Sequence, residues 1–226
     1  MSTVPTINID YFSDVLCVWA YAAQIRVDEL QLEFGERVRV RARYFPVFGH
    51  TRKKIETQWE AKGGLQGYAT HVHATARPFE HVQVHPEVWI TNTPTSSLPA
   101  HLWLAALRCL EEDGQCAAGS VEKAAWAMRE AFFRDARDIS RFDTLRAILS
   151  TCSFEIGAVQ ARIENGEAFA VQSQDHKMST DMNIRSSPTM IFNEDRQRLT
   201  GNVGYKIIQA NVRELLDSPG KRHSWC

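Results

Sequence analysis

The sequence lacks any C-x-x-C pair, although it contains five cysteines. They are Cys17, Cys109, Cys116, Cys152 and Cys226. An odd number of cysteines at irregular spacing indicates neither a disulfide framework nor a zinc site. Most of them are therefore expected to be small buried hydrophobic residues. Cys17 differs from the others because it lies where a strand pattern turns into a helix pattern.

The sequence also lacks a long apolar run, a strong net charge and a secretory pattern. No run approaches the ~18 apolar residues of a membrane span. The net charge of −1 gives no reason to expect nucleic acid or an anionic membrane as a partner. The start, MSTVPTINIDYF, has no basic stretch followed by an apolar stretch, so it does not resemble a signal peptide. We therefore expect a cytoplasmic protein, and the reducing cytoplasm argues against structural disulfides.

Alternation and helical spacing at the beginning of the chain indicate an α/β organisation. TINIDYF alternates and predicts a strand that ends near Phe12, and a helix pattern follows as far as Gly35. RVRVRARYFPVF alternates strongly and predicts a second strand from about Val38 to Pro46. Because a helix joins the two strands, they are expected to form a parallel pair with a right-handed crossover.

The middle of the chain lacks the strand alternation seen at its beginning. From about Gly49 to Pro99, breaker-rich stretches such as KGGLQGY predict a loop-like segment. Helical patterns follow, with Ser120 as an expected cap and Ser140 paired with Asp143 as a capping box. PTMIFN and QRLTG then predict a hairpin, and YKIIQANVRELLD predicts a closing amphipathic helix.

The predicted order is therefore βαβ, a helical insertion and ββα. This order divides the chain into two domains and a tail. Residues 1–49 and 183–220 form the first, discontinuous domain, residues 50–182 form a mainly helical insertion domain, and residues 221–226 form a loose tail.

Two features carry the candidate chemistry. At the first turn of a helix, N–H groups without intrahelical acceptors and the helix dipole favour a thiolate, which is the nucleophilic form of Cys17. The alternative is that Cys17 is a buried core cysteine. The stretch RSSPTMIFN places Pro188 directly before a strand. This suits a cis Ser187-Pro188 bond beside a helix N-terminus, while an ordinary trans proline would also open a strand.

With these features in a βα…ββα order, the chain resembles the DsbA-like branch of the thioredoxin superfamily. DVLCVWAY looks like the family's D-x-x-C-P-W-C-Y, and RSSPTMIFNEDRQRLTGNVGYKIIQANVRELL looks like its C-terminal half. FEIGAVQARIENGEAFAVQSQD resembles its last inserted helices. The resemblance spans nearly the whole chain and is closer to the cytoplasmic FrnE-type members than to periplasmic oxidants. It implies an α/β thioredoxin fold with an all-helical insertion domain, and a cis-proline that faces the active-site cysteine.

Two positions depart from the family pattern. Val18 replaces the usual proline, and Ala20 replaces the second cysteine. The second cysteine of a dithiol enzyme resolves the mixed disulfide formed by the first, so a cycling C-x-x-C mechanism is not available. The leading hypothesis is an enzyme, a DsbA-family thiol oxidoreductase-like protein with the single active-site cysteine Cys17. Its thiolate would attack a small disulfide or glutathionylated substrate, and glutathione would act as the external thiol, with no tightly bound cofactor.

Relatives without the second cysteine suggest a second hypothesis, a glutathione-dependent isomerase or transferase of the 2-hydroxychromene-2-carboxylate isomerase or kappa type. By that analogy Trp19, Ser187 and Pro188 would contact glutathione. Asn202, near the start of the last helix, would accompany the N–H groups that bind the γ-glutamyl carboxylate, or it would be only a helix cap. A third hypothesis is a non-catalytic thioredoxin-fold binding module.

The histidines and aromatic residues of the middle region carry weaker signals. His71 and His73 lie two residues apart, but metal sites need three or four ligands, so no metal site is predicted. Four aromatic residues are expected in the core or in a cleft beside Cys17: Trp59, Tyr68, Trp89 and Trp103. The sequence leaves open the roles of His71, His73 and Cys226, and whether the protein forms a homodimer.

Two quantitative expectations follow for Cys17. If the family resemblance holds, its side chain lies within roughly 4 Å of Ser187 or Pro188. Because the helix dipole and the backbone N–H groups favour the thiolate, we expect its pKa to be depressed into the range of activated cysteines. Asp14, three residues earlier, would work against ionisation if it lies close to the thiol.

Overall fold

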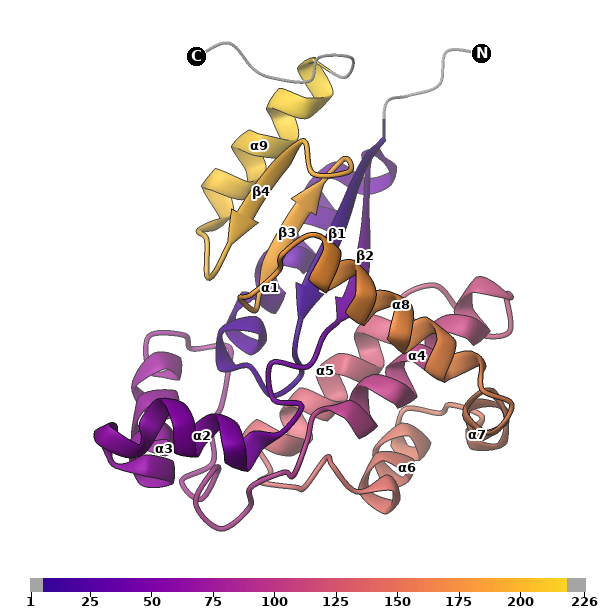
Figure 1. The fold of residues 1–226 in the computed structure, drawn as a ribbon. Helices are drawn as coiled ribbons and strands as arrows, with labels where there is room; N and C mark the ends of the chain where they lie inside the picture. The colour runs from indigo at the N-terminus through magenta and orange to yellow at the C-terminus, as the bar shows by residue number, and fades with distance from the viewer. Residues whose placement is uncertain (1–5, 219–226) are drawn as a thin grey trace.

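The computed structural model describes residues 6–218, which are built around a four-stranded mixed sheet with strand order β2-β1-β3-β4 (Figure 1). The strands are β1 (Ile7–Ser13), β2 (Val38–Tyr44), β3 (Thr189–Phe192) and β4 (Gln197–Thr200). β1 pairs parallel with β2, and it pairs antiparallel with β3. β3 and β4 form the predicted hairpin. The sheet therefore joins the two ends of the chain.

Two helices cover one face of this sheet. They are α1 (Val18–Phe34), which connects β1 to β2, and α9 (Tyr205–Asp217), which closes the chain. Leu30 of α1 and Val212 of α9 are fully buried in one cluster with Ile9 of β1 and Phe192 of β3. Because side chains alternate along a strand, the residues between these positions point to the opposite face.

The remaining helices lie between β2 and β3 in the chain and form a second body below the sheet (Figure 1). They are α2 (Thr51–Trp59), α3 (Gly64–Ala76), α4 (Leu98–Glu112), α5 (Ser120–Phe133), α6 (Phe142–Thr151), α7 (Ile156–Glu164) and α8 (Glu167–Asp181). α4 forms the centre of this body, since every residue from 100 to 110 is buried. The predicted α/β fold with a helical insertion is confirmed.

α8 reaches back onto the second face of the sheet through a buried charge cluster. Asp175 lies 3.0 Å from Nη1 of Arg43 on β2 and 2.9 Å from Nη2 of Arg108 on α4. Arg43 also pairs with Asp10 of β1 at 2.8 Å. Removing one member of a buried ion pair leaves an uncompensated charge, so this cluster fixes how the helical body docks on the sheet.

The expectation of a loop-like segment from Gly49 to Pro99 is wrong, because α2 and α3 occupy much of it. The glycines of this segment have a packing role and do not break the helices. Gly63 has a positive φ of 90° at the junction before α3. A Cβ on Gly67, inside α3, would lie 1.8 Å from the carbonyl oxygen of Lys62. Glycine is therefore needed there for a close approach of backbone to backbone.

Both predicted helix caps are also wrong. α5 begins at Ser120 with Gly119 at the cap position, and α6 is preceded by Arg141 rather than Ser140. The Ser140 hydroxyl donates to Asp138, which turns it away from the helix.

No helix among residues 6–218 is long and apolar enough to cross a membrane. The predicted loose tail at residues 221–226, which includes Cys226, lies outside the described residues.

Candidate functional site

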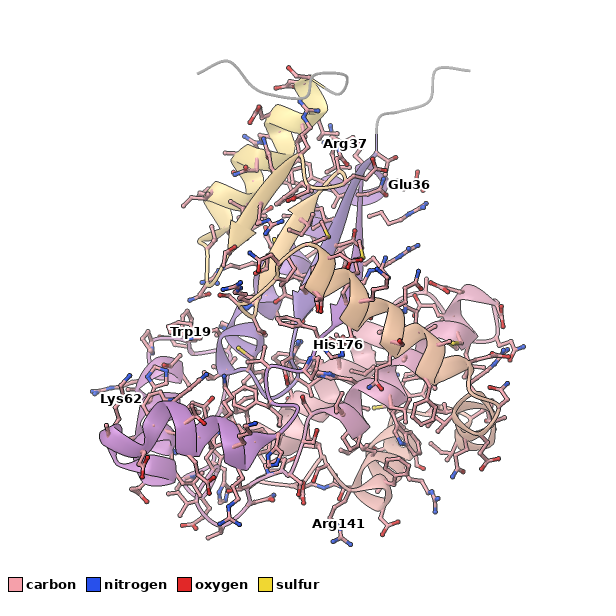
Figure 2. The ribbon with its side chains drawn as sticks, viewed as in Figure 1. Trp19, Glu36, Arg37, Lys62, Arg141 and His176 are labelled. Carbon is pink, nitrogen blue, oxygen red and sulfur yellow. The ribbon has the colours of Figure 1, made fainter. Side chains whose placement is uncertain are left out.

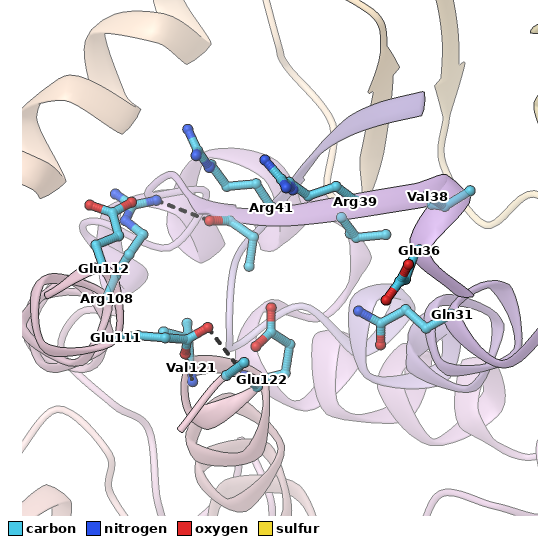
Figure 3. A pocket seen from close by; sticks show the side chains of 14 residues that line it. Gln31, Glu36, Val38, Arg39, Arg41, Arg108, Glu111, Glu112, Val121 and Glu122 are labelled. Atoms are coloured by element: carbon cyan, nitrogen blue, oxygen red, sulfur yellow. Dashed lines mark hydrogen bonds between the residues drawn. The ribbon is translucent and has the colours of Figure 1, made fainter. Parts of the chain in front are cut away.

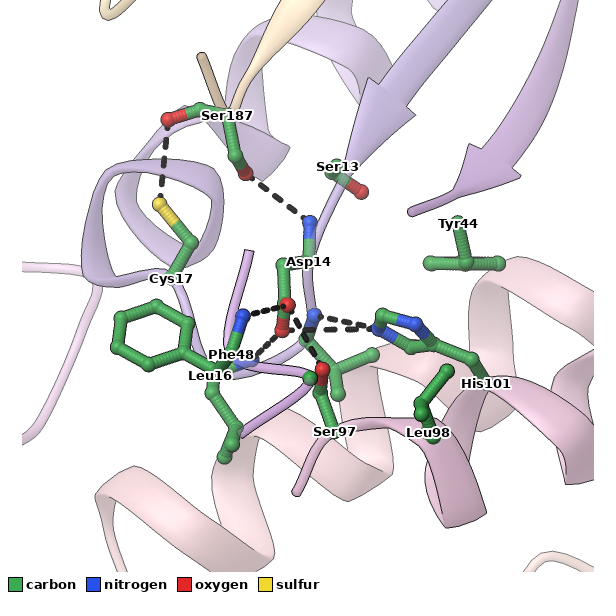
Figure 4. Close-up of polar contacts among 12 residues, drawn as sticks. Ser13, Asp14, Leu16, Cys17, Tyr44, Phe48, Ser97, Leu98, His101 and Ser187 are labelled. Atoms are coloured by element: carbon green, nitrogen blue, oxygen red, sulfur yellow. Dashed lines mark hydrogen bonds and ion pairs between the residues drawn. The ribbon is translucent and has the colours of Figure 1, made fainter. Parts of the chain in front are cut away.

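Cys17 occupies the turn between β1 and α1 (Figure 4). It is the N-cap residue of α1 with an extended backbone, at φ −86° and ψ 115°. Its thiol donates to the carbonyl oxygen of Ser187, at 3.2 Å from Sγ. The expected proximity of Cys17 to the proline loop is therefore confirmed. The peptide bond between Ser187 and Pro188 is cis.

A second contact ties the proline loop to the same turn. The Ser187 hydroxyl accepts a hydrogen bond from the N–H of Asp14 at 3.0 Å. Pro188 is buried, and its carbonyl accepts from the N–H of Gly201 at 2.8 Å. The loop before β3 is thus held on one side by the β1–α1 turn and on the other side by the segment before α9.

A buried polar cluster lies directly beneath Cys17 and is centred on Asp14. One carboxylate oxygen accepts from the N–H of Leu16 at 2.9 Å, and the other accepts from the N–H of Phe48 at 2.8 Å. The Ser97 hydroxyl donates to the second oxygen at 2.8 Å. His101 Nε2 lies 3.6 Å from the first oxygen, and both side chains are fully buried. The cluster therefore joins β1, α4 and the segments that precede α2 and α4.

The carboxyl of Asp14 is ionised in this environment. Burial opposes ionisation, but His101 and the hydrogen bonds from Phe48 and Leu16 outweigh it and hold the pKa of Asp14 below its ordinary value. A fully buried negative charge therefore lies close to the Cys17 thiol.

The expectation of a depressed pKa for Cys17 is wrong. Only 7% of the residue is exposed, and burial raises the pKa of its thiol above the ordinary value. The negative charge of Asp14 adds to this effect. The side chain of Ser187 and the N–H groups of Ala20 and Trp19 act in the opposite direction but do not overcome burial. Cys17 is therefore a protonated thiol near neutral pH.

The second position of the motif offers no sulfur. Ala20 is fully buried on the first turn of α1. The four cysteines among the described residues are free: Cys17, Cys109, Cys116 and Cys152. Within this part of the chain, no cysteine is bonded to Cys17.

Asn202 is not a helix cap. α9 begins at Tyr205 with Gly204 as its N-cap. The Asn202 side-chain oxygen instead accepts from the guanidinium of Arg26 on α1. Arg26 and Pro188 line one small cavity, and Cys17 is not among the residues that line it. No sequence signal pointed to Arg26.

The other predicted residues are divided between core and surface. Trp89, Trp103 and Tyr68 are buried core residues. Trp59 is partly buried against His71, with ring centroids 4.9 Å apart. Trp19 is partly exposed, on the side of the molecule where α2 and α3 lie (Figure 2).

His73 is also only partly buried. Among residues 6–218, no group of three or more histidine, cysteine or acidic side chains could hold a metal ion.

Comparison with known proteins now identifies the family. The model of the DSBA-like thioredoxin domain matches residues 8–213. The chain belongs to the DSBA-like thioredoxin domain family. No curated protein sequence matches this DsbA-like chain.

Solved structures of DsbA-like and related proteins share the fold. A "putative protein disulfide isomerase" from Nitrosomonas europaea superimposes with a TM-score of 0.76 at 14% identity, covering 95% of this chain and 100% of its own. The cytosolic disulfide reductase DsbM from Pseudomonas aeruginosa, solved with GSH, has a TM-score of 0.61 at 13% identity and coverages of 94% and 98%. A 2-hydroxychromene-2-carboxylate isomerase has a TM-score of 0.64 at 13% identity and coverages of 96% and 100%. At these identities the likeness establishes the fold alone.

Proposed function

We propose that this DsbA-like chain is a glutathione-dependent enzyme of the isomerase or transferase type, in which Cys17 acts as a protonated thiol. The observation that carries the proposal is the buried Cys17 thiol, which donates a hydrogen bond beside the cis Pro188. A protonated thiol is a poor nucleophile but still a hydrogen-bond donor. The most suitable role for it is to donate to the sulfur of a bound glutathione.

In this mechanism the glutathione thiolate would be the nucleophile. Cys17 would turn its S–H from the Ser187 carbonyl to the glutathione sulfur and stabilise the thiolate. The thiolate would then add to one carbon of an activated C=C bond, so that the carbon–sulfur bond forms, the π bond breaks and its electron pair moves onto the electron-withdrawing group of the substrate. In an isomerase the remaining single bond rotates, the carbon–sulfur bond breaks and the double bond forms again, which releases glutathione. In a transferase the adjacent carbon takes a proton from solvent and the carbon–sulfur bond persists. Neither outcome consumes Cys17 or needs an oxidant.

Two further features support glutathione as the co-substrate. Ala20 removes the internal resolving thiol, so a second sulfur must come from outside the motif. Arg26 is partly buried and has no carboxylate partner among residues 6–218, while its guanidinium contacts Asn202 beside the proline loop. A carboxylate of glutathione could pair with it. The fold shared with the isomerase and with GSH-bound DsbM agrees with this proposal.

A second candidate is glutathione-linked thiol–disulfide exchange at Cys17. It is favoured by the N–H groups of Ala20 and Trp19, which lower the pKa of the thiol against the effect of burial. In this case the Cys17 thiolate would attack the glutathione sulfur of a glutathionylated substrate, form a mixed disulfide with that glutathione and release the thiolate of the substrate. A second glutathione would then restore the free thiol.

Glutathione titrations of the wild type, Cys17→Ser and Cys17→Ala distinguish these candidates. If Cys17 is a hydrogen-bond donor, wild type and Cys17→Ser give the ultraviolet absorbance of a bound glutathione thiolate at pH 7, while Cys17→Ala loses it. If Cys17 is the nucleophile, oxidised glutathione gives a mixed disulfide detectable by intact mass, and serine abolishes it. Absence of glutathione binding in calorimetry would overturn both candidates and leave a binding module.

A further inference from the structure

The outer edge of β2 faces a hollow of about 950 Å³ instead of another strand (Figure 3). The hollow lies between this edge and the adjoining ends of α4 and α5, from which Glu111 and Glu122 face it. Cys17 is not among the residues that line it. This region is therefore separate from the proposed glutathione site.

Two contacts establish which backbone groups of β2 point outward. The carbonyl of Ala42 accepts from Nη1 of Arg108 at 3.0 Å, and the N–H of Tyr44 donates to Asp175 at 3.2 Å. Both partners lie outside the sheet. Because a strand alternates with a period of two residues, Val40 also directs its backbone groups outward.

The outward groups that remain form a short open segment. The N–H of Val38 is already bonded to the carbonyl of Gly35. No partner within residues 6–218 takes the carbonyl of Val38, the N–H and carbonyl of Val40, or the N–H of Ala42. These groups match the hydrogen-bonding pattern of one added strand, since a peptide can pair with an exposed sheet edge. Arg108 closes the segment at the Ala42 end.

The side chains of the open segment supply a charge pattern. Arg39 and Arg41 point to the same side of β2, away from Glu122 (Figure 3). Both are exposed, and no ion pair within residues 6–218 involves either of them. The next arginine in the row, Arg43, is paired with Asp10 and Asp175. The two free guanidinium groups therefore lie two residues apart beside an open strand edge.

We propose that the β2 edge binds an extended segment of a partner protein with the pattern acidic–apolar–acidic. Residues directly opposite one another on paired strands share a face. The two acidic residues of the partner, at positions i and i+2, would therefore lie opposite Arg39 and Arg41. The residue between them would lie opposite Val40 and point to the other face, toward the buried Val121. An apolar side chain suits that position.

A second copy of this chain fits the edge poorly. Antiparallel pairing of two β2 strands about Val40 would place Arg39 of each copy opposite Arg41 of the other. Like charges directly opposite one another destabilise a strand pair. Charge complementarity therefore favours an acidic segment of a different protein.

A fluorescein-labelled peptide TEVET tests this inference by anisotropy at low salt, with TKVKT and TEEVT as pattern controls. We expect TEVET to bind, TKVKT not to bind and TEEVT to bind more weakly. The double variant Arg39→Glu with Arg41→Glu should weaken TEVET binding by about tenfold or more, because two cross-strand attractions become repulsions.

Variants at Val40 test the backbone part of the inference. Val40→Pro removes the outward N–H without touching the pairing with β1, and proline is tolerated on an edge strand. Val40→Thr keeps the N–H and serves as the matched control. Val40→Pro should abolish TEVET binding while its circular dichroism and glutathione titration match those of Val40→Thr. Equal binding of TEVET by both variants, equal binding of TKVKT, or a dimer of the free protein that Val40→Pro dissociates would overturn the inference.

Discussion

Asp14 and Asp175 are both buried aspartates, yet their surroundings differ in charge. Asp175 lies between two guanidinium groups, those of Arg43 and Arg108, and their positive charges compensate it. Asp14 is held by two backbone N–H groups, a serine hydroxyl and His101. Its contacts satisfy its hydrogen bonds without a permanently charged partner.

The difference contributes to the state of the thiol. A carboxylate between two guanidinium groups has little effect on nearby groups, whereas Asp14 has no guanidinium partner among residues 6–218 and its charge adds to burial in raising the pKa of the Cys17 thiol. Asp14 therefore acts with burial to keep Cys17 protonated. Asp175 has a structural role in docking α8 on the sheet, whereas Asp14 places a negative charge close to the thiol of the candidate site.

The largest expected effect concerns the compensated aspartate. Asp175→Asn would leave the buried Arg43 and Arg108 without their shared counter-charge. We expect the free energy of unfolding to fall by roughly 3–5 kcal/mol, measured by urea denaturation. Asp181→Asn on the same helix is the control. The exposed ion pair between Asp181 and Lys177 should contribute less than about 1 kcal/mol to the free energy of unfolding. Similar losses in the two variants would contradict the structural role of Asp175.

Restoring the second cysteine of the motif tests whether the site around Cys17 can carry out dithiol chemistry. Ala20→Cys would place a thiol one helical turn from Cys17, at a separation that a disulfide can span. Because Ala20 is fully buried, overpacking should cost about 1–3 kcal/mol of unfolding free energy. We expect measurable insulin reduction by this variant and none by Ala20→Ser. If Ala20→Cys also shows none, the site has no remaining capacity for dithiol chemistry.

Neutralising the uncompensated aspartate should make the thiol more reactive. Burial is the main cause of the raised pKa of Cys17, and Asp14→Asn removes the negative charge that adds to it, so iodoacetamide should alkylate Cys17 faster at pH 7 than in the wild type. Ser97→Ala keeps the charge and removes one hydrogen bond. It should cost about 1–2 kcal/mol of stability without accelerating alkylation. Equal alkylation rates in Asp14→Asn and wild type would show that Asp14 does not control the thiol.

The lowered pKa of Asp14 also predicts how the free energy of unfolding changes in acid. Its pKa is lower in the folded protein than in the unfolded chain, so its contribution is present above the unfolded pKa and is lost as the pH falls through the folded pKa. The unfolding free energy of the wild type should therefore fall more steeply in acid than that of Asp14→Asn. Parallel acid profiles would contradict a lowered pKa.

The sequence predicts most of the fold because periodicity is local. The β1–α1–β2 unit, the β3–β4 hairpin and α9 follow from alternation and helical spacing. α2 and α3 do not follow from the sequence, because glycines such as Gly63 and Gly67 are usual in loops. Here Gly67 meets the backbone of Lys62, a contact that no local pattern reveals.

The candidate site is only partly predictable for the same reason. The D-x-x-C spacing and the proline loop identify Cys17, Asp14 and Ser187. Ser97 and His101 reach Asp14 from more than eighty residues away in the chain, and no motif connects them. The helix dipole and the N–H groups of the first turn predict a lowered pKa for Cys17, whereas burial by the whole fold decides its direction.

The most direct test of the account is the pH dependence of Cys17 alkylation in a variant whose other cysteines are replaced by serine. A raised pKa means that the protonated thiol contributes stability below the unfolded pKa, and that this contribution is lost as the pH rises through the folded pKa. The account predicts slow alkylation at pH 7 and a midpoint above the ~8.5 of a free thiol. A midpoint well below that value would show a thiolate at neutral pH and would contradict the proposed role of Cys17 as a hydrogen-bond donor.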